Sequence, residues 1–188
     1  MASEFEHTPR FGIEELKVDD IDAATEMRKQ SWIDTYVNVD LNITEEWINE
    51  YFADKLSAEN LQKRRKRFLD AKAAGTFNAW VARDNSGKII GSTTPFVMEN
   101  GTQRVGSIYI DKEWHGKGLG AQLMQKVVDW FDPDKPIALE VISYNERAKA
   151  FYKKWGFEEE PGSETLYADR IPEITMIRKP NNQIEGEV

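Results

Sequence analysis

A glycine-rich segment between two apolar runs is the part of the chain whose spacing most directly suggests chemistry. It reads Trp114-His-Gly-Lys-Gly-Leu-Gly120, after a strand-like run at 105–110 and before a helix-like run at 121–131. Glycines at every second position allow backbone N–H groups to converge at the positive end of the following helix. Such a loop suits a phosphate or pyrophosphate group, while the alternative is a tight turn that binds no ligand.

A second motif begins 25 residues after Gly120 and reads Asn-Glu-Arg-Ala-Lys-Ala-Phe-Tyr-Lys-Lys-Trp-Gly-Phe, from Asn145 to Phe157. Together the two motifs resemble those of the GNAT superfamily of acyl-CoA N-acyltransferases. The first matches Arg/Gln-x-x-Gly-x-Gly/Ala, except that His115 stands where arginine or glutamine is usual. The second matches Asn-x-x-Ala-x-x-Phe-Tyr-x-x-x-Gly-Phe at every named position. The resemblance covers roughly residues 10–180.

The resemblance implies that acetyl-CoA is the acyl donor. The loop amides would hold its pyrophosphate, with charge or hydrogen bonds added by Lys117 and by the shorter, largely neutral His115. The strand before the loop would pair with the pantetheine amides and polarise the thioester carbonyl, and Asn145 would cap its helix or contact the pantetheine arm. The residues expected to bind the cofactor are Ile108, Tyr109, Ile110, His115, Gly116, Lys117, Gly118, Leu119, Gly120 and Asn145.

Tyr152 falls where this family often carries a tyrosine that protonates the departing thiolate. The resemblance therefore implies that Tyr152 is the general acid, while the alternative is an aromatic packed beside Phe151. The incoming ammonium must also lose a proton, but the family uses various carboxylates for this step, so no position carries over. The carboxylates considered as the base are Glu26, Asp34, Glu99 and Asp111.

The acceptor side is expected at the first two helices, where aromatic residues stand among many carboxylates. Residues 1–60 hold fifteen acidic and five basic side chains, whereas the whole chain has a net charge of −8. Aromatic rings with acids suit an amine cation, and Ser31-Trp32-x-x-Thr35-Tyr36 resembles a branch of the family with polyamine-acetylating members. We expect Trp32 and Tyr36 to contact a small cationic amine such as a polyamine; the alternative is that such aromatics pack the core.

The composition, with 40% hydrophobic and 31% charged side chains among 188 residues, is that of an ordinary globular chain. It contains no cysteine, which excludes disulfides, thiolate metal sites and a cysteine nucleophile, and two histidines give no metal-site spacing. No apolar run approaches the ~20 residues of a membrane span, and the first residues do not resemble a signal peptide. We expect a cytoplasmic protein that uses no metal and binds neither membrane nor nucleic acid.

The order of predicted elements favours an α/β fold. Helices are predicted at 20–37, 44–56, 57–75, 119–131 and 145–155, and strands at 11–18, 77–83, 88–98, 103–110, 136–142, 157–160 and 172–178. Expected N-caps are Thr44, Ser57 and Asn145. These elements predict a mixed, partly antiparallel central sheet with helices on both faces, and the resemblance implies strands that splay apart around a CoA cleft. One domain is expected at 10–180, after an extension at 1–9 and before a polar tail at 181–188.

Several alternatives remain beside this interpretation. The segment Gly116-x-Gly118-x-x-Ala121 also fits a dinucleotide-binding fingerprint, with Glu140 near the expected distance, but it lies late in the chain and leaves the second motif unexplained. A non-catalytic CoA-binding or interaction domain on the same fold is a further alternative. The basic run Lys63–Arg67 is expected to be a solvated helix face, or else to contact the CoA 3′-phosphate or a partner. A homodimer is the expected assembly if the chain is oligomeric.

Overall fold

The computed structural model describes residues 10–180, so the predicted extension at 1–9 and the predicted tail at 181–188 lie outside the described residues. The strands are β1 (Phe11–Glu15), β2 (Trp80–Asp84), β3 (Ile89–Val97), β4 (Gln103–Ile110), β5 (Ile137–Ile142), β6 (Phe157–Glu159), β7 (Thr165–Tyr167) and β8 (Ile171–Arg178). The helices are α1 (Ile21–Tyr36), α2 (Glu45–Lys55), α3 (Ala58–Ala73), α4 (Leu119–Trp130) and α5 (Glu146–Lys153), with short 3-10 helices at Val18–Asp20 and Lys112–Trp114.

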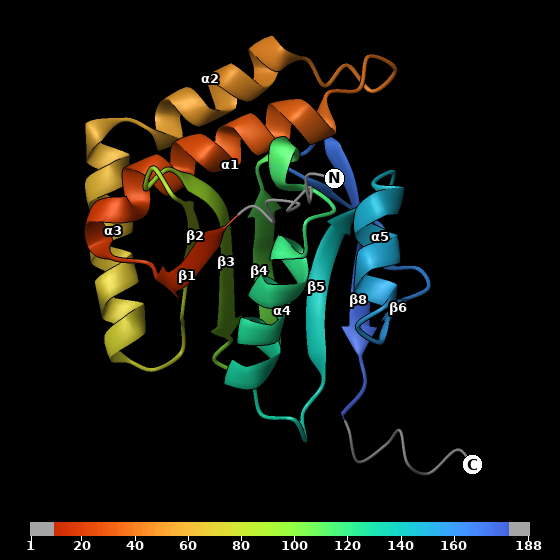
Figure 1. The fold of residues 1–188 in the computed structure, drawn as a ribbon. Helices are drawn as coiled ribbons and strands as arrows, with labels where there is room; N and C mark the ends of the chain where they lie inside the picture. The colour runs from red at the N-terminus through yellow and green to blue at the C-terminus, as the bar shows by residue number, and fades with distance from the viewer. Residues whose placement is uncertain (1–9, 181–188) are drawn as a thin grey trace, which may run out of the picture.

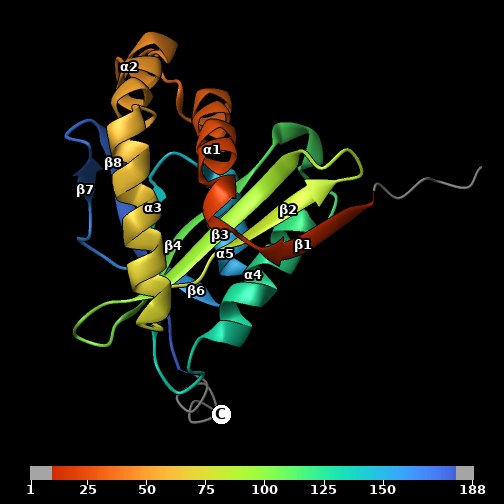
Figure 2. The same ribbon diagram turned by 90° about the vertical axis from the view of Figure 1, so that its left-hand side faces the viewer.

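Within the described residues, all eight strands belong to one sheet, in the order β1-β2-β3-β4-β5-β8-β6, with β7 also paired to β8. The β4–β5 pair is parallel and the others are antiparallel. Helices α1, α2 and α3 lie on one face, and α4 and α5 lie on the other (Figures 1 and 2). The predicted mixed α/β fold with helices on both faces is therefore confirmed.

The helices begin where the sequence predicts their caps. The Thr44 hydroxyl accepts a hydrogen bond from the N–H of Trp47, and the Asn145 side chain accepts one from the N–H of Ala148. Ser57 caps α3 in the same way. Each cap satisfies one of the N–H groups that the first turn of a helix leaves without a partner.

The two central strands separate after only three paired positions. β4 pairs with β5 from Gln103 to Val105, whereas its pairing with β3 continues to Ile110. Residues 106–110 of β4 therefore have a strand on one side and a gap on the other. This is the splay that the resemblance implies, and Figure 1 shows β4 and β5 diverging toward the top of the view.

An irregularity in β4 lies where this separation begins. Thr93 pairs with Ile108 and Pro95 pairs with Val105, so β4 contains one more residue than β3 across this interval. This residue count is that of a β-bulge, which bends a strand and increases its twist. Gly106 lies inside it, and a Cβ there would lie 2.7 Å from the carbonyl oxygen of Thr94. The bulge thus requires glycine for a close backbone approach.

We expect Gly106→Ala to destabilise the protein by about 1–3 kcal/mol, because the added methyl group has to displace backbone atoms. The measurement is urea unfolding followed by circular dichroism. Gly12→Ala is the matched control, since it also adds a methyl to a strand glycine but meets no atom within 4 Å. Equal unfolding free energies for the two variants would contradict this account of the bulge.

Candidate functional site

A cavity of about 410 Å³ lies at the carboxyl end of β4, and both sequence motifs contribute to its wall. The last turns of α1 and the residues of α5 complete it. Of the predicted site residues, the wall contains Tyr36, Ile108, Tyr109, Ile110, His115, Gly116, Gly118, Gly120, Asn145 and Tyr152. Trp32, Lys117 and Leu119 are not part of it. The structure therefore brings together most of the residues that the sequence singles out.

The edge of β4 that faces the gap directs backbone groups toward this cavity, where the carbonyl oxygen of Ile110 already accepts a hydrogen bond from His115. The N–H of Asp111 donates to the carbonyl oxygen of Ile90 in β3 at 2.9 Å. Because alternate residues of a strand direct their N–H and C=O groups to opposite neighbours, those of Ile108 and Ile110 are directed toward the gap. An extended chain with amide groups can pair with such an edge as an added strand does.

The three loop glycines serve two different purposes. Gly116 and Gly118 have φ angles of +74° and +80°, which L side chains rarely adopt, and Gly118 is the residue immediately before α4. Gly120 lies inside α4, and a Cβ there would lie 3.0 Å from the Cδ1 atom of Ile110, so glycine allows the helix to approach β4 closely. Leu119 is fully buried and does not line the cavity.

His115 connects the loop to β4 and to α5. One ring nitrogen, Nε2, lies 3.1 Å from the carbonyl oxygen of Ile110, and the other, Nδ1, lies 2.8 Å from Nη1 of Arg147. A guanidinium only donates, so Nδ1 accepts and Nε2 carries the proton that it donates to Ile110. Burial, together with the Arg147 charge, lowers the pKa of His115. The ring is therefore a neutral support for Arg147.

Arg147 is a site residue that the sequence reasoning missed. It lies in the first turn of α5, lines the cavity, and places a permanent cation beside the glycine loop. Lys117, the predicted source of charge, does not line the cavity. Its ammonium lies 5.2 Å from the ring centroid of Trp114. The signal that could have identified Arg147 is a basic residue two positions after the helix-capping Asn145.

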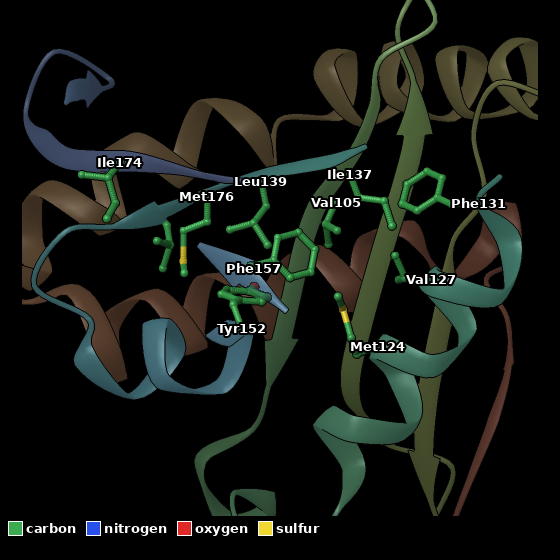
Figure 3. Packing of buried hydrophobic residues seen from close by; sticks show 11 residues of the cluster. Val105, Met124, Val127, Phe131, Ile137, Leu139, Tyr152, Phe157, Ile174 and Met176 are labelled. Atoms are coloured by element: carbon green, nitrogen blue, oxygen red, sulfur yellow. The ribbon is translucent and has the colours of Figure 1, made fainter. Parts of the chain in front are cut away.

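The Tyr152 side chain extends from α5 into the core, beside Phe157 and near Met176 (Figure 3). It is 8% exposed and also lines the cavity. Its ring packs edge-on against Phe151 and Phe157, with centroids 5.3 and 5.9 Å away. Burial, with a smaller contribution from Tyr109, raises the pKa of Tyr152, so its hydroxyl stays protonated as a donor must.

Tyrosines from α1 and β4 form the opposite side of the cavity. Burial and the neighbouring hydroxyls of Tyr109 and Tyr152 raise the pKa of Tyr36. The Tyr109 hydroxyl accepts a hydrogen bond from Nε1 of Trp32 at 2.9 Å, and the Tyr144 hydroxyl donates to the carbonyl oxygen of Tyr36 at 2.9 Å. This part of the wall is polar but uncharged.

Trp32 occupies a different place from the one expected of a substrate contact. It is 3% exposed and stacks on Tyr51, with ring centroids 5.2 Å apart. The indole lies in the core outside the cavity wall, where its N–H donates to the Tyr109 hydroxyl, and its contact with the acceptor stays a prediction. Tyr36, by contrast, lies at the cavity as expected.

The described wall of this cavity contains no carboxylate, so none of the four carboxylates considered as the base lies in it. Two of the four are held in ion pairs: Asp34 with Lys112 at 2.9 Å and Asp111 with Lys88 at 2.8 Å. The lining of this cavity therefore assigns no direct base among the described residues.

Residues 10–180 also bear on two other kinds of site, a metal centre and a membrane-spanning helix. No group of three or more His, Asp or Glu side chains in this range could hold a metal ion. No helix in this range has the length and apolar character that crossing a membrane requires. Glu140, the acidic residue of the dinucleotide alternative, lies inside β5 and pairs with Arg104, rather than following the end of a strand.

Comparison with known proteins identifies the class. Residues 41–157 match the model of the acetyltransferase (GNAT) family. Because the match covers more than half of the chain, this protein belongs to the GNAT acetyltransferase family. It is an acetyl-CoA-dependent N-acetyltransferase, which confirms the resemblance and the predicted acetyl donor. No curated protein matches the chain.

Solved structures agree with this fold at low sequence identity. The PaiA N-acetyltransferase of Thermoplasma acidophilum, in complex with coenzyme A, is 22% identical, with a TM-score of 0.70 over 90% of this chain and 99% of that one. A GNAT acetyltransferase of Staphylococcus aureus Mu50 is 19% identical, with a TM-score of 0.62 over 90% and 98% of the two chains. A spermidine N-acetyltransferase SpeG chimera from Vibrio cholerae and hSSAT is 16% identical, with a TM-score of 0.61 over 93% and 98%.

Proposed function

We propose that this enzyme transfers the acetyl group of acetyl-CoA directly to a primary amine within a ternary complex. One observation carries the proposal: a single cavity is lined by the glycine loop, the free edge of β4 and the buried hydroxyl-bearing Tyr152. These are the groups that hold a pyrophosphate, align an amide-containing arm and donate a proton at its end. We also propose that residues 10–180 form the acetyltransferase domain.

Each part of the cavity has a role in the reaction. The amides of 116–120 and the Arg147 guanidinium bind the pyrophosphate, while Ile108, Ile110 and Asn145 align the pantetheine arm. The amine nitrogen attacks the thioester carbonyl carbon, a C–N bond forms and the C–S bond breaks. A backbone N–H of β4 stabilises the oxygen that becomes negative, and the Tyr152 hydroxyl protonates the departing sulfur. The attacking nitrogen loses one proton to water as the amide forms, and the tyrosinate regains a proton from water.

Direct transfer is favoured because the chain contains no cysteine to carry the acetyl group as a thioester. Initial rates measured over a grid of acetyl-CoA and amine concentrations test this point, since a ternary complex gives intersecting double-reciprocal lines. Parallel lines would indicate an acetyl-enzyme and contradict direct transfer.

Binding and turnover together test the whole proposal. We expect saturable binding of acetyl-CoA in a calorimetric titration, no binding of NAD, and release of CoA when an amine panel that includes spermidine is supplied. Binding of NAD alone would favour the dinucleotide alternative. Binding of acetyl-CoA without turnover of any amine would favour a non-catalytic CoA-binding domain.

The acceptor that the sequence predicts is a small cationic amine such as a polyamine. Support comes from the excess of acidic residues in 1–60, and the SpeG chimera is a structural neighbour that acts on spermidine. Against it, the described wall of the cavity offers tyrosine hydroxyls rather than carboxylates. An acceptor that carries an anionic group is a second candidate, favoured by the basic cavity described below. The cytoplasmic location and the homodimer stay predictions.

Arg147 gives a separate prediction about cofactor binding. We expect Arg147→Gln to raise the Kd for acetyl-CoA about ten-fold at low salt, because a charge-assisted hydrogen bond to phosphate is lost. Calorimetric titration measures this, and the difference should shrink as salt is added. Lys153→Gln is the control on the same helix, since Lys153 pairs with Glu159 outside the cavity wall. An unchanged Kd in Arg147→Gln would remove Arg147 from the cofactor site.

A further inference from the structure

A second cavity, of about 550 Å³, lies on the other face of the sheet from the glycine loop. Its walls come mainly from α1 and α3, and its floor comes from β3 and β4. Figure 2 shows α1 and α3 on this face of the sheet and α4 on the opposite face. The basic run at 63–67 therefore lies away from the glycine loop, which does not fit its alternative role as a contact for the CoA 3′-phosphate.

The side chains around this cavity carry a strong excess of positive charge. Asp54 is its one carboxylate, and the basic residues in the wall are Arg28, Lys55, Lys63, Arg64 and Arg67. Within residues 10–180, Lys63 forms an ion pair with Glu59, and the other four basic residues form none. Asp54 already accepts a hydrogen bond from the Asn60 amide at 2.9 Å. The described protein therefore neutralises only part of this positive charge.

Arg28 is held in place without a full set of hydrogen-bond partners. Its Nε atom is buried and has no partner among the described residues. Its guanidinium carbon lies 5.2 Å from the ring centroid of Phe52 and 6.0 Å from that of Trp32, so aromatic faces fix the position of the planar group. A buried N–H donor without a partner costs folding free energy, which an anionic ligand that accepts from it would offset.

Arg64 is directed into the same cavity from α3. Its Nη1 donates to the hydroxyl of Thr25 at 2.7 Å, and that hydroxyl donates in turn to the carbonyl oxygen of Ile21. Burial and the nearby positive charge of Arg28 lower the pKa of Arg64. The guanidinium groups of Arg28 and Arg64 thus line the same cavity, where the charge of one disfavours the charge of the other.

The floor of the cavity adds neutral hydroxyl groups. Ser92 and Thr94 of β3 and Ser107 of β4 line it, and the hydroxyls of Thr94 and Ser107 lie 2.8 Å apart. Hydroxyls can donate to the oxygens of a carboxylate or phosphate group while guanidinium groups supply the charge. We propose that this second cavity binds a carboxylate or phosphate group through Arg28 and Arg64, and that the group belongs to the acceptor amine.

The assignment to the acceptor rests on the proposed function and on the position of the two cavities. On α1, Arg28 lies one turn before Ser31, which lines the first cavity. On β4, Ser107 of the second cavity is the neighbour of Ile108 of the first. An acceptor whose anionic group is bound in the second cavity would therefore direct its amine toward the first cavity, where the proposed function places the thioester.

The first experiment probes the cavity itself with inorganic phosphate. We expect calorimetric binding to the wild type, and about ten-fold or greater weakening in Arg28→Met and in Arg64→Met. Arg65→Gln is the matched control, because Arg65 is adjacent on α3 but pairs with Asp22 at 2.6 Å outside the cavity wall. Arg64→Met should fold, since it removes a repelling charge, and its binding of acetyl-CoA confirms that it has done so.

The second experiment compares matched acceptors: an α-amino acid against its amide, and phosphoethanolamine against ethanolamine. In at least one pair we expect the kcat/KM of the anionic acceptor to exceed that of its neutral partner about ten-fold or more. The ratio of these two kcat/KM values should fall toward one in Arg64→Met but not in Arg65→Gln. Phosphate binding with a ratio near one in the wild type would overturn the acceptor assignment and identify a site for a separate anion. Absence of phosphate binding together with a ratio near one would overturn the anion site.

The two experiments separate this inference from the proposed function. If acetyl-CoA binds and no amine is acetylated, the proposed function and the acceptor assignment both fail, while phosphate titration still decides whether the cavity binds anions. If spermidine is acetylated efficiently and the anionic amines are not, the acceptor assignment fails and the proposed function stands.

Discussion

Replacing Tyr152 with phenylalanine is expected to lower kcat by about a hundred-fold or more, because the leaving sulfur then has no positioned proton donor. The Kd for acetyl-CoA should stay within about two-fold of the wild-type value, since the phenylalanine ring keeps the packing against Phe151 and Phe157. Pre-steady-state mixing of saturated enzyme with amine measures the chemical step itself. An unchanged chemical step would show that Tyr152 is only a core aromatic.

The pH dependence provides a second test of the same residue. An ordinary tyrosine is half ionised near pH 10, but burial raises the pKa of Tyr152 above that value, so its proton is retained to higher pH. The wild-type kcat at saturating amine is therefore expected not to decline from about pH 8 to about pH 10. A decline with a midpoint below pH 10 that is absent in Tyr152→Phe would contradict the raised pKa.

Gly118→Val is the second change with a large expected effect. Gly118 has φ near +80° at the start of α4, and a β-branched residue in that conformation is strained by about 1–3 kcal/mol. Any relaxation turns the amides of the loop away from a common point, and the valine methyls occupy the space where a pyrophosphate would lie. We expect the Kd for acetyl-CoA to rise at least about ten-fold, as measured by calorimetry.

Two controls separate loss of the loop geometry from loss of stability. Gly162→Val places the same residue at a φ of +73° in an exposed turn, so it should share the strain and leave the affinity for acetyl-CoA unchanged. Gly118→Asn introduces a residue that tolerates the left-handed conformation and should therefore bind better than Gly118→Val. If Gly118→Val bound acetyl-CoA as tightly as Gly162→Val, the loop would not be the pyrophosphate site.

Features that depend on short stretches of sequence could be predicted. Thr44, Ser57 and Asn145 cap their helices because a cap is a contact between residues three positions apart. The strands on either side of α4 splay as the resemblance implies. By contrast, β7 was not predicted, because Thr165–Tyr167 is too short to show alternation and forms only by pairing with β8. The residues of β7 do not show that β8 is its pairing partner.

Features that depend on tertiary contacts were beyond the sequence. The resemblance implies that Trp32 lies on the acceptor side, but the sequence does not show that aromatic residues of α2 and β7 pack against it. Arg147 acquires its place through His115, 32 positions earlier. Arg64 and Arg67 are three residues apart and so share a face of α3, but their partner in the second cavity, Arg28, comes from another helix. The sequence gives the chemical type of each side chain, but the side chains that surround it depend on tertiary contacts that cannot be predicted from its own segment.

The break between β4 and β5 creates a strand edge in the middle of a sheet rather than at its margin. An exposed edge normally invites pairing with any extended chain, and proteins usually cover or distort such edges. Here the unpaired stretch covers only residues 106–110, with a bulge at one end and the glycine loop and α5 beside it. A thin chain with amide groups has less bulk to accommodate in this short stretch than a peptide strand, which carries side chains on both faces. We expect this geometry to favour a thin cofactor arm over a further β-strand at this edge.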